Sequence, residues 1–201
     1  KNEVVNLTLP YWKGKSLYEN LRKTLPDKIN QAWDANVIDD TWVSAAGLGN
    51  VIVDYKGVVD KGLSDVMRRI ENKLKRLDPR EPGNTRKRWF LEAALQGNQA
   101  VVMFSGRIAD CCKEQAEQEK DETRRRELLK LEDICRNVPL NPARTFHEAV
   151  QSIYMILLAV HLESNGHAIS LGRFDQYVYP YYKRDLEEGR ITREEALEIV
   201  E

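Results

Sequence analysis

The chain has few of the residues that commonly mark a chemical site, and almost no net charge. Its 201 residues include three cysteines and three histidines, and the formal net charge is −1. So few cysteines, in an odd number, argue against a disulfide framework and for a reduced, cytoplasmic compartment. The balanced charge gives no electrostatic footprint for nucleic acid, and the longest apolar run, residues 153–160, is far too short to span a bilayer.

Familiar catalytic and metal-binding motifs are also missing. Gly47 and Gly49 lack the third glycine and the preceding strand of a dinucleotide-binding loop, and there is no Gly-x-Ser-x-Gly elbow. His161 and His167 are six residues apart, without a cysteine or histidine at ligand spacing. We therefore expect no metal site.

The hydrophobic pattern is typical of a helical protein large enough for one domain with a core. Apolar residues recur every three or four positions in residues 55–77 and 85–120, and residues 146–164 are apolar on nearly all sides. Ser16, Thr145 and Thr192 are the expected N-caps of three helices. Pro180 is expected to open a helix that Gly189 ends.

The helix expected at residues 85–120 should bury one apolar stripe. Gly97 in its middle suggests close packing, and the adjacent Cys111 and Cys112 would act as small apolar residues. The residues expected to form this stripe are Phe90, Ala93, Ala94, Gly97, Val101, Phe104, Ile108, Cys111 and Cys112.

Residues 161–182 combine polar and aromatic side chains at a density that a surface loop does not need. Buried polar groups require partners, and the walls of substrate cavities combine apolar area with a few placed polar groups. The polar members are Glu163, Asn165, His167, Ser170, Arg173, Asp175 and Gln176, and the aromatic ones are Phe174, Tyr177, Tyr179, Tyr181 and Tyr182.

This stretch resembles a known family. Residues 165–182, NGHAISLGRFDQYVYPYY, are similar to the Asn-Gly-His-x-x-x-x-Gly-Arg-x-Asp-Gln-Tyr-x-x-Pro-Tyr-Tyr segment of glycyl radical enzymes, the relatives of pyruvate formate-lyase. Four further segments resemble family motifs in the same order: residues 9–15, 47–55, 88–94 and 142–151. The similarity therefore extends over nearly the whole chain.

The resemblance implies a fold and a chemistry. Residues 1–201 would be part of a single pyruvate formate-lyase-like domain, and would form the mainly α N-terminal part of a ten-stranded α/β barrel. The chain begins without methionine and stops inside a helical pattern, so we expect a fragment, with the catalytic cysteine loop and the glycyl radical loop downstream. The fragment itself would bind no cofactor and be inactive.

Partners are implied in the same way. An activating enzyme that uses S-adenosylmethionine and an iron–sulfur cluster would install the glycyl radical. The substrate would be a small molecule of anaerobic metabolism, and the full-length protein would be a homodimer that contacts neither nucleic acid nor membrane.

Three positions are the expected substrate contacts: His167, Asn50 and Ala168. His167 lies between a glycine and an alanine, which leaves room beside its imidazole. The diol dehydratase branch of the family usually has histidine at the position of Asn50 and serine at that of Ala168. An amide cannot donate a proton as imidazolium does, and alanine donates nothing, so the glycerol or propanediol assignment is weakened. Arg173 and Asp175 are expected to support the site as a buried ion pair.

We therefore expect part of a glycyl radical lyase that cleaves a C–O, C–N or C–C bond through a thiyl radical, as a dehydratase, an amine lyase or a decarboxylase does. One alternative is formate C-acetyltransferase, the activity of pyruvate formate-lyase itself. The other is a non-catalytic helical module that binds a partner through an apolar helix face.

Overall fold

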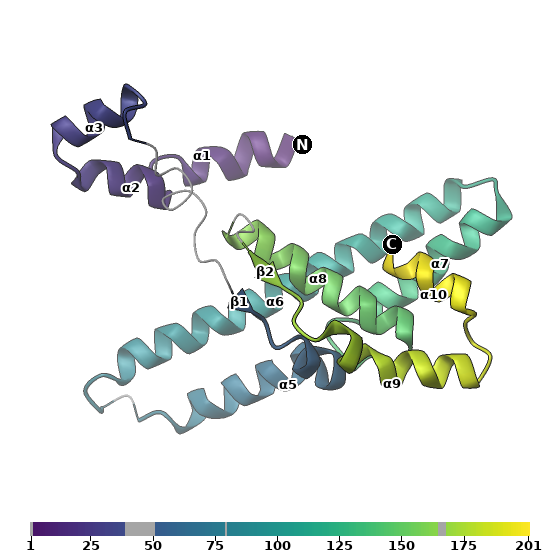
Figure 1. Cartoon of the computed structure of the whole chain (residues 1–201). Coiled ribbons are helices and arrows are strands. Elements are labelled where there is room, and N and C mark those ends of the chain that lie inside the picture. The colour runs from purple at the N-terminus through teal and green to yellow at the C-terminus, as the bar shows by residue number, and fades with distance from the viewer. Residues whose placement is uncertain (1, 39–50, 79, 165–167) are drawn as a thin grey trace. The chain divides into compact units, whose positions relative to one another are not determined.

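The computed structural model describes residues 2–38, 51–78, 80–164 and 168–201, and it is mainly helical, as the sequence predicts. The chain forms two compact units, one of residues 1–51 with 160–170 and one of residues 52–159 with 171–201. Figure 1 shows the elements of both units. None of the described helices is long and apolar enough to cross a membrane.

Short helices make up most of the first unit. In chain order they are η1 (Val4–Thr8, a π-helical turn), α1 (Leu9–Trp12), α2 (Leu17–Thr24) and α3 (Asp27–Asp34). The predicted cap at Ser16 is confirmed, because its hydroxyl accepts from the Glu19 amide and the Glu19 carboxylate accepts from the Ser16 amide.

Arg22 joins α2 to α3. Its guanidinium donates to the side chain of Asn30 at 3.0 Å and to the carboxylate of Asp34 at 2.6 Å. It also lies 5.3 Å from the centre of the Trp33 ring, which is 6% exposed. Trp33 is thus the buried centre of this helix pair, in contact with a cation held by two polar partners.

Two short strands pair with each other: β1 (Val51–Ile52) and β2 (Ile169–Ser170). The apolar residues 51–53 predict an extended segment, which β1 confirms. The sequence did not predict β2, because pairing of strands more than a hundred residues apart leaves no local pattern in two residues.

The second unit contains the longer helices and the chain between them. These are α5 (Tyr55–Arg76), α6 (Asn84–Gln118), α7 (Glu122–Asn137), most of α8 (Phe146–Ser164), α9 (Phe174–Glu187) and α10 (Arg193–Val200). The Asp54 carboxylate caps α5 by accepting from the Gly57 amide, and Thr192 caps α10 as predicted, in a capping box with Glu195.

Residues 138–143, from the chain between α7 and α8, interrupt α5 at Gly62. Gly62 has a left-handed φ of 73°, and the next two amides leave the helix. The Leu63 amide donates to the carbonyl of Pro139 at 2.8 Å, and the Ser64 amide donates to that of Leu140 at 2.9 Å. A Cβ at position 62 would lie 2.3 Å from the Leu140 oxygen, so glycine alone fits here.

The inserted segment, residues 138–143, is fastened on two further sides. The Ala143 amide donates to the carbonyl of Val59 at 2.9 Å. From α6, the buried Ser105 hydroxyl lies 2.9 Å from the carbonyl oxygen of Cys135 and 2.8 Å from that of Val138. Backbone without regular structure can be buried here because its polar groups have partners.

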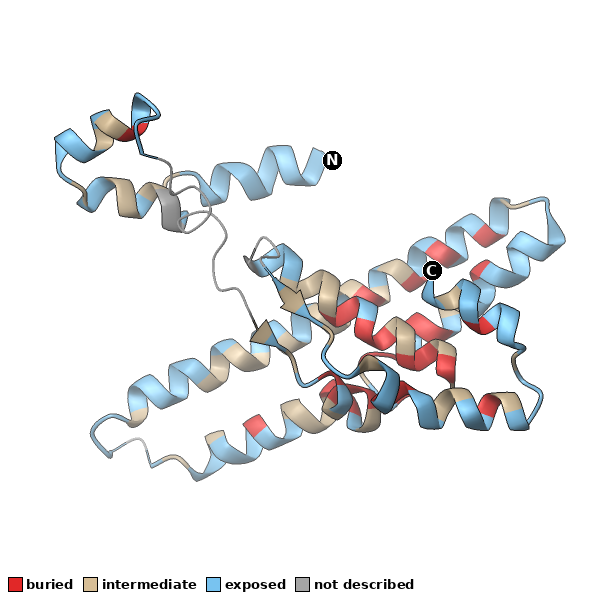
Figure 2. Ribbon diagram, in the orientation of Figure 1, coloured by how far each residue is buried: buried red, intermediate tan, exposed pale blue. Residues whose placement is uncertain are grey.

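The core lies around α8. Figure 2 shows buried residues concentrated in α8 and the segments beside it, whereas the ends of α5 and α6 near their connecting loop are largely exposed. At its centre Ala109 of α6, Cys135 of α7 and Met155 of α8 form one cluster. Phe104, Ile108 and Leu131 pack against this cluster.

The expected buried stripe of α6 is wrong over its first half and at Cys111, which is exposed. Phe90 is 72% exposed, Ala93 and Gly97 are exposed, and a Cβ at Gly97 would meet nothing within 4 Å. The residues of α6 that are buried are Ser105, Ala109, Cys112 and Ala116. Apolar periodicity identifies a helix face, but it does not tell which part of that face has a partner.

Two further predictions concern the bounds of α8 and α9. α8 has the predicted bounds, residues 146–164, and its first half is buried. The predicted start of the next helix at Pro180 is wrong, because α9 begins at Phe174 and contains Pro180. The aromatic contact of Phe174 with Tyr177, at 6.0 Å between ring centres, packs the turn that precedes the proline.

Candidate functional site

The positions predicted to contact substrate adjoin the paired strands in the sequence. Asn50 directly precedes β1, and His167 and Ala168 precede β2. Asn50 and His167 lie outside the described residues, so their roles stay predictions. Ala168 is exposed and has a φ of 51°, which is uncommon for a residue with a Cβ. Ala168, the residue before β2, thus has the left-handed backbone of a turn.

Arg173 and Asp175 do not form the expected buried ion pair. Both are exposed, and residues two apart at a helix start do not face each other. Arg173 is instead the N-cap residue of α9, where its carbonyl accepts from the amide of Gln176 at 3.0 Å. Asp175 lies in the first turn, where a carboxylate is favourable beside the helix N-terminus. Their support of the site remains a prediction.

Tyr177 connects α9 to the residues that follow β2. Its hydroxyl donates to the carbonyl of Leu171 at 2.9 Å. Burial, and then the neighbouring Tyr55, raises the pKa of Tyr177 to about 12. The phenol therefore stays neutral and keeps donating, which holds residues 171–174 against the helix.

The N-terminus of α8 is capped from a distant helix. The carboxylate of Asp185 on α9, 3% exposed, accepts from the Phe146 amide at 2.7 Å. The guanidinium of Arg190 donates to the same carboxylate at 2.8 and 3.0 Å. A charge this deeply buried is stable because it has an ion-pair partner and a backbone donor at the positive end of a helix.

A second buried carboxylate lies one turn into α8. Glu148, 2% exposed, accepts from the backbone amide and guanidinium of Arg144 and, at 3.0 Å, from the Asn137 amide side chain. Its own amide donates to the Thr145 hydroxyl at 3.2 Å, as the predicted cap requires. The guanidinium of Arg144 also donates to Asp133 of α7 at 2.9 Å. Together with Asp185, Glu148 fixes the helix that leads to the predicted substrate contacts.

Sequence reasoning did not assign these two carboxylates a buried role. Asp185 lies 39 residues from the amide that it caps, so no local pattern reveals the bond. The spacing of Arg144 and Glu148 at i and i+4 was a usable signal, because such pairs face each other on a helix or at its start.

A hollow of about 310 Å³ lies beside the start of α5. The Tyr181 hydroxyl donates to the Asp60 carboxylate at 3.0 Å, and Lys56 pairs with the same carboxylate. Burial, followed by the interaction with Asp60, raises the pKa of Tyr181 to about 12. Lys56 and Asp60 satisfy each other, and Arg184 lies 3.8 Å from the carboxylate of Asp185 outside the hollow. Charged groups that are already paired favour a structural role over a chemical one.

The two buried cysteines offer no activated thiol. Cys112 and Cys135 are buried, and burial raises the pKa of both, that of Cys135 to about 11. Neutral thiols are poor nucleophiles. Over the described ranges, no group of three or more histidine, cysteine, aspartate or glutamate side chains could hold a metal ion.

Comparison with known families identifies the class of protein. The model of the pyruvate formate lyase-like family matches residues 1–201. The chain therefore belongs to the pyruvate formate lyase-like family, as the resemblance of its motifs implies.

Particular relatives are glycyl radical enzymes and lyases. Isethionate sulfite-lyase of Nitratidesulfovibrio vulgaris is 38% identical, with 98% of this chain and 25% of the relative covered. A solved structure concerning 1,2-propanediol dehydration in Roseburia inulinivorans is 38% identical, has a TM-score of 0.84, and matches over 95% of this chain and 23% of that one. A glycyl radical enzyme from Archaeoglobus fulgidus is 34% identical, with a TM-score of 0.80 over 98% of this chain and 25% of that one. The chain thus spans about a quarter of the length of these relatives.

Proposed function

We propose that this chain is the N-terminal helical part of a glycyl radical lyase that acts on a small polar substrate. The observation that carries the proposal is the 38% identity to isethionate sulfite-lyase over 98% of the chain. Radical cleavage is the activity of the whole protein, whose cysteine and glycine loops would lie in the part that the relatives have and this chain does not. Formate C-acetyltransferase and a non-catalytic module have no comparable support.

The helical part would serve as a scaffold for one wall of the substrate cavity. α8 is fixed at its start by Asp185 and Glu148, and Tyr177 holds the chain just after β2. Between these two anchored segments the sequence contains His167 and Ala168. His167 and Asn50 would contact the substrate, with Ala168 beside them.

The first candidate substrate is isethionate, cleaved at its C–S bond to release sulfite. It follows from the name of the relative above and from the two positions that weaken a diol assignment. Asn50 and Ala168 stand where the diol dehydratase branch has histidine and serine. The second candidate is 1,2-propanediol, which the equally identical Roseburia structure favours.

Activation would come from a partner enzyme that uses S-adenosylmethionine and an iron–sulfur cluster. Residues 1–201 would belong to one domain of the whole protein, which would work as a homodimer in the cytoplasm of an anaerobe.

The test uses the full-length protein, activated under anoxic conditions. We expect a glycyl radical signal in electron paramagnetic resonance, and sulfite release from isethionate that exceeds aldehyde release from 1,2-propanediol. Absence of the radical after activation contradicts the class, whereas a radical with diol turnover alone contradicts the first substrate.

Two variants then test the cavity. His167→Ala should lower kcat/KM by about a hundredfold or more, as loss of a positioned polar contact does. Ala168→Ser should raise turnover of the diol relative to isethionate, because it introduces the hydroxyl that the diol dehydratase branch usually has at this position of the cavity wall. Unchanged kinetics in His167→Ala would place His167 outside the cavity.

A further inference from the structure

The paired strands β1 and β2 are too short to fix their own alignment. Each contains two residues, so the ladder between them has few hydrogen bonds. None of these residues is buried, and register is weakly specified where a strand has no buried face. A slip of one residue would turn every side chain to the opposite face. Ala168 directly precedes β2, so its direction depends on what holds this strand in place.

Each strand continues into a helix through a tight turn, β1 into α5 and β2 into α9 (Figure 1). Asp54, before α5, has φ −72° and ψ 63°, and Arg173, before α9, has φ −85° and ψ 61°. These angles are those of an inverse γ-turn, which is common at strand ends. In the first of these turns the Tyr55 amide donates to the carbonyl of Val53 at 2.7 Å. The two helices therefore control where the strands end.

The backbone after β2 lies directly against a side chain of β1. Gly172 has a left-handed φ of 67°, and a Cβ at this position would lie 3.2 Å from the Cγ2 methyl of Ile52. That methyl is bonded to the Cβ of a β-branched residue, so it moves only with the strand or by rotation about a stiff χ1. A side chain at position 172 would thus displace β1 or the Ile52 side chain by a few tenths of an ångström.

Tyr177 holds the residue next to Gly172. Its hydroxyl donates to the carbonyl of Leu171 at 2.9 Å, and its ring is 9% exposed and packs on Phe174. Burial, and after it the nearby phenol of Tyr55, raises the pKa of Tyr177, so the hydroxyl remains a donor. The end of β2 is therefore fixed from two directions, by β1 and by α9.

We propose that Gly172 and Tyr177 are positioning residues of the lyase, which set the register of β2 on β1 and thereby the direction in which Ala168 meets the substrate. The proposal rests on the proposed function, because it requires Ala168 in the cavity wall. Neither residue contacts the substrate. β2 cannot slide along β1 without breaking the bond to Leu171 and moving Gly172 away from Ile52.

Gly172→Ala tests the contact with β1 in the activated full-length protein. We expect kcat/KM, normalised to the glycyl radical content, to fall by about fivefold or more, as displacement of a substrate contact does. Gly189→Ala is the matched control, because Gly189 has the same φ of 67° and a Cβ there would meet nothing within 4 Å. Both substitutions strain the backbone alike, but only the first should change kcat/KM.

Ile52→Ala supplies the rescue. It removes the methyl group that a side chain at position 172 would meet. The double variant Gly172→Ala/Ile52→Ala should therefore recover most of the kcat/KM that Gly172→Ala loses. A role of Gly172 in stability alone would not produce this recovery of turnover per radical.

Tyr177→Phe tests the second contact, since it removes only the hydroxyl that holds Leu171. We expect kcat/KM per radical to fall by about fivefold or more here as well. Ser105→Ala is the control, because it also removes a buried hydroxyl bonded to backbone carbonyls, but in α6. It should lower the melting temperature and leave kcat/KM unchanged.

The outcomes separate this proposal from the function on which it rests. If the wild type turns over its substrate, unchanged kcat/KM in Gly172→Ala and Tyr177→Phe overturns the positioning role alone. Equal losses in Gly172→Ala and Gly189→Ala also overturn it, because backbone strain would then suffice. A wild type that forms no radical or has no turnover contradicts the proposed function and the positioning role together.

Discussion

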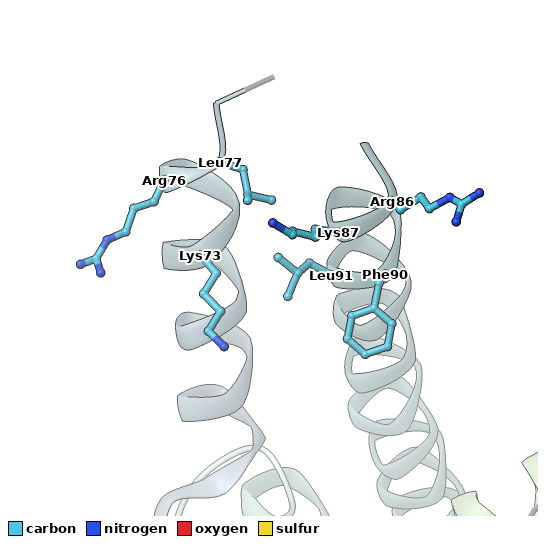
Figure 3. A pocket seen from close by; sticks show the side chains of 7 residues that line it. All are labelled: Lys73, Arg76, Leu77, Arg86, Lys87, Phe90 and Leu91. Atoms are coloured by element: carbon cyan, nitrogen blue, oxygen red, sulfur yellow. The ribbon is translucent and has the colours of Figure 1, made fainter. Parts of the chain in front are cut away.

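The two ends of the α5–α6 pair have similar apolar patterns and very different surroundings. At one end Val58, Val59 and Leu63 are buried, and the inserted segment 138–143 bonds to the backbone of α5. At the other end Phe90 is exposed and the helices enclose an open groove. Similar apolar patterns therefore give a buried anchor where a third segment packs on the helices, and an exposed groove where no other described segment covers them (Figure 3).

The substitution expected to have the largest effect on stability is Gly62→Ala, at the anchored end of the pair. The substitution places a Cβ 2.3 Å from the Leu140 oxygen and forces a side chain into a left-handed φ of 73°. We expect a loss of about 3 kcal/mol or more in the free energy of unfolding. Urea unfolding of the full-length protein measures it.

Gly97→Ala is the control for that substitution, because Gly97 lies within α6 and a Cβ there would meet nothing within 4 Å. It should stabilise the protein by about 0.5–1 kcal/mol, since alanine is the better helix former. Equal effects of the two substitutions would remove the distinction between anchored and open regions.

A second test, of smaller effect, is Ser105→Ala. The buried hydroxyl of Ser105 is shared between the carbonyls of Cys135 and Val138, and its loss leaves them without this donor. We expect destabilisation of about 1–3 kcal/mol in thermal unfolding. Phe90→Ala, at the open end of the same helix, should change stability little because that ring is 72% exposed. A larger loss for Phe90→Ala would show that the open end is covered in the whole protein.

The smallest expected effect is a pH dependence at His147 on α8. Burial, and then the positive charge of Lys130, lowers the pKa of His147 below 6.5, whereas Glu148 opposes the shift. The folded protein therefore binds fewer protons here than the unfolded chain. The stability from His147 is complete above about pH 6.5 and is lost as the pH falls through the lowered pKa.

We expect a decrease of up to about 1 kcal/mol between pH 7 and pH 5 from this residue. His147→Gln should flatten that part of the profile in urea unfolding at a series of pH values. An identical slope in the variant would assign the acid sensitivity to other groups.

Many features could be predicted from the sequence because they depend on local chemistry. The bounds of α8 and the caps at Ser16 and Thr192 depend on residues close together in the chain, so pattern and capping rules sufficed. The family was also readable from short motifs, and the family match over residues 1–201 confirms it.

Only the tertiary structure decided the rest. The left-handed turn at Gly62, the cap that Asp185 provides for α8, and the exposure of Phe90 all depend on what lies nearby from distant parts of the chain. An apolar stripe has the same sequence whether or not a partner covers it, and a carboxylate does not reveal which amide it will cap. The sequence by itself therefore determined most of the helices and the family, whereas packing decided which surfaces are core and which remain exposed.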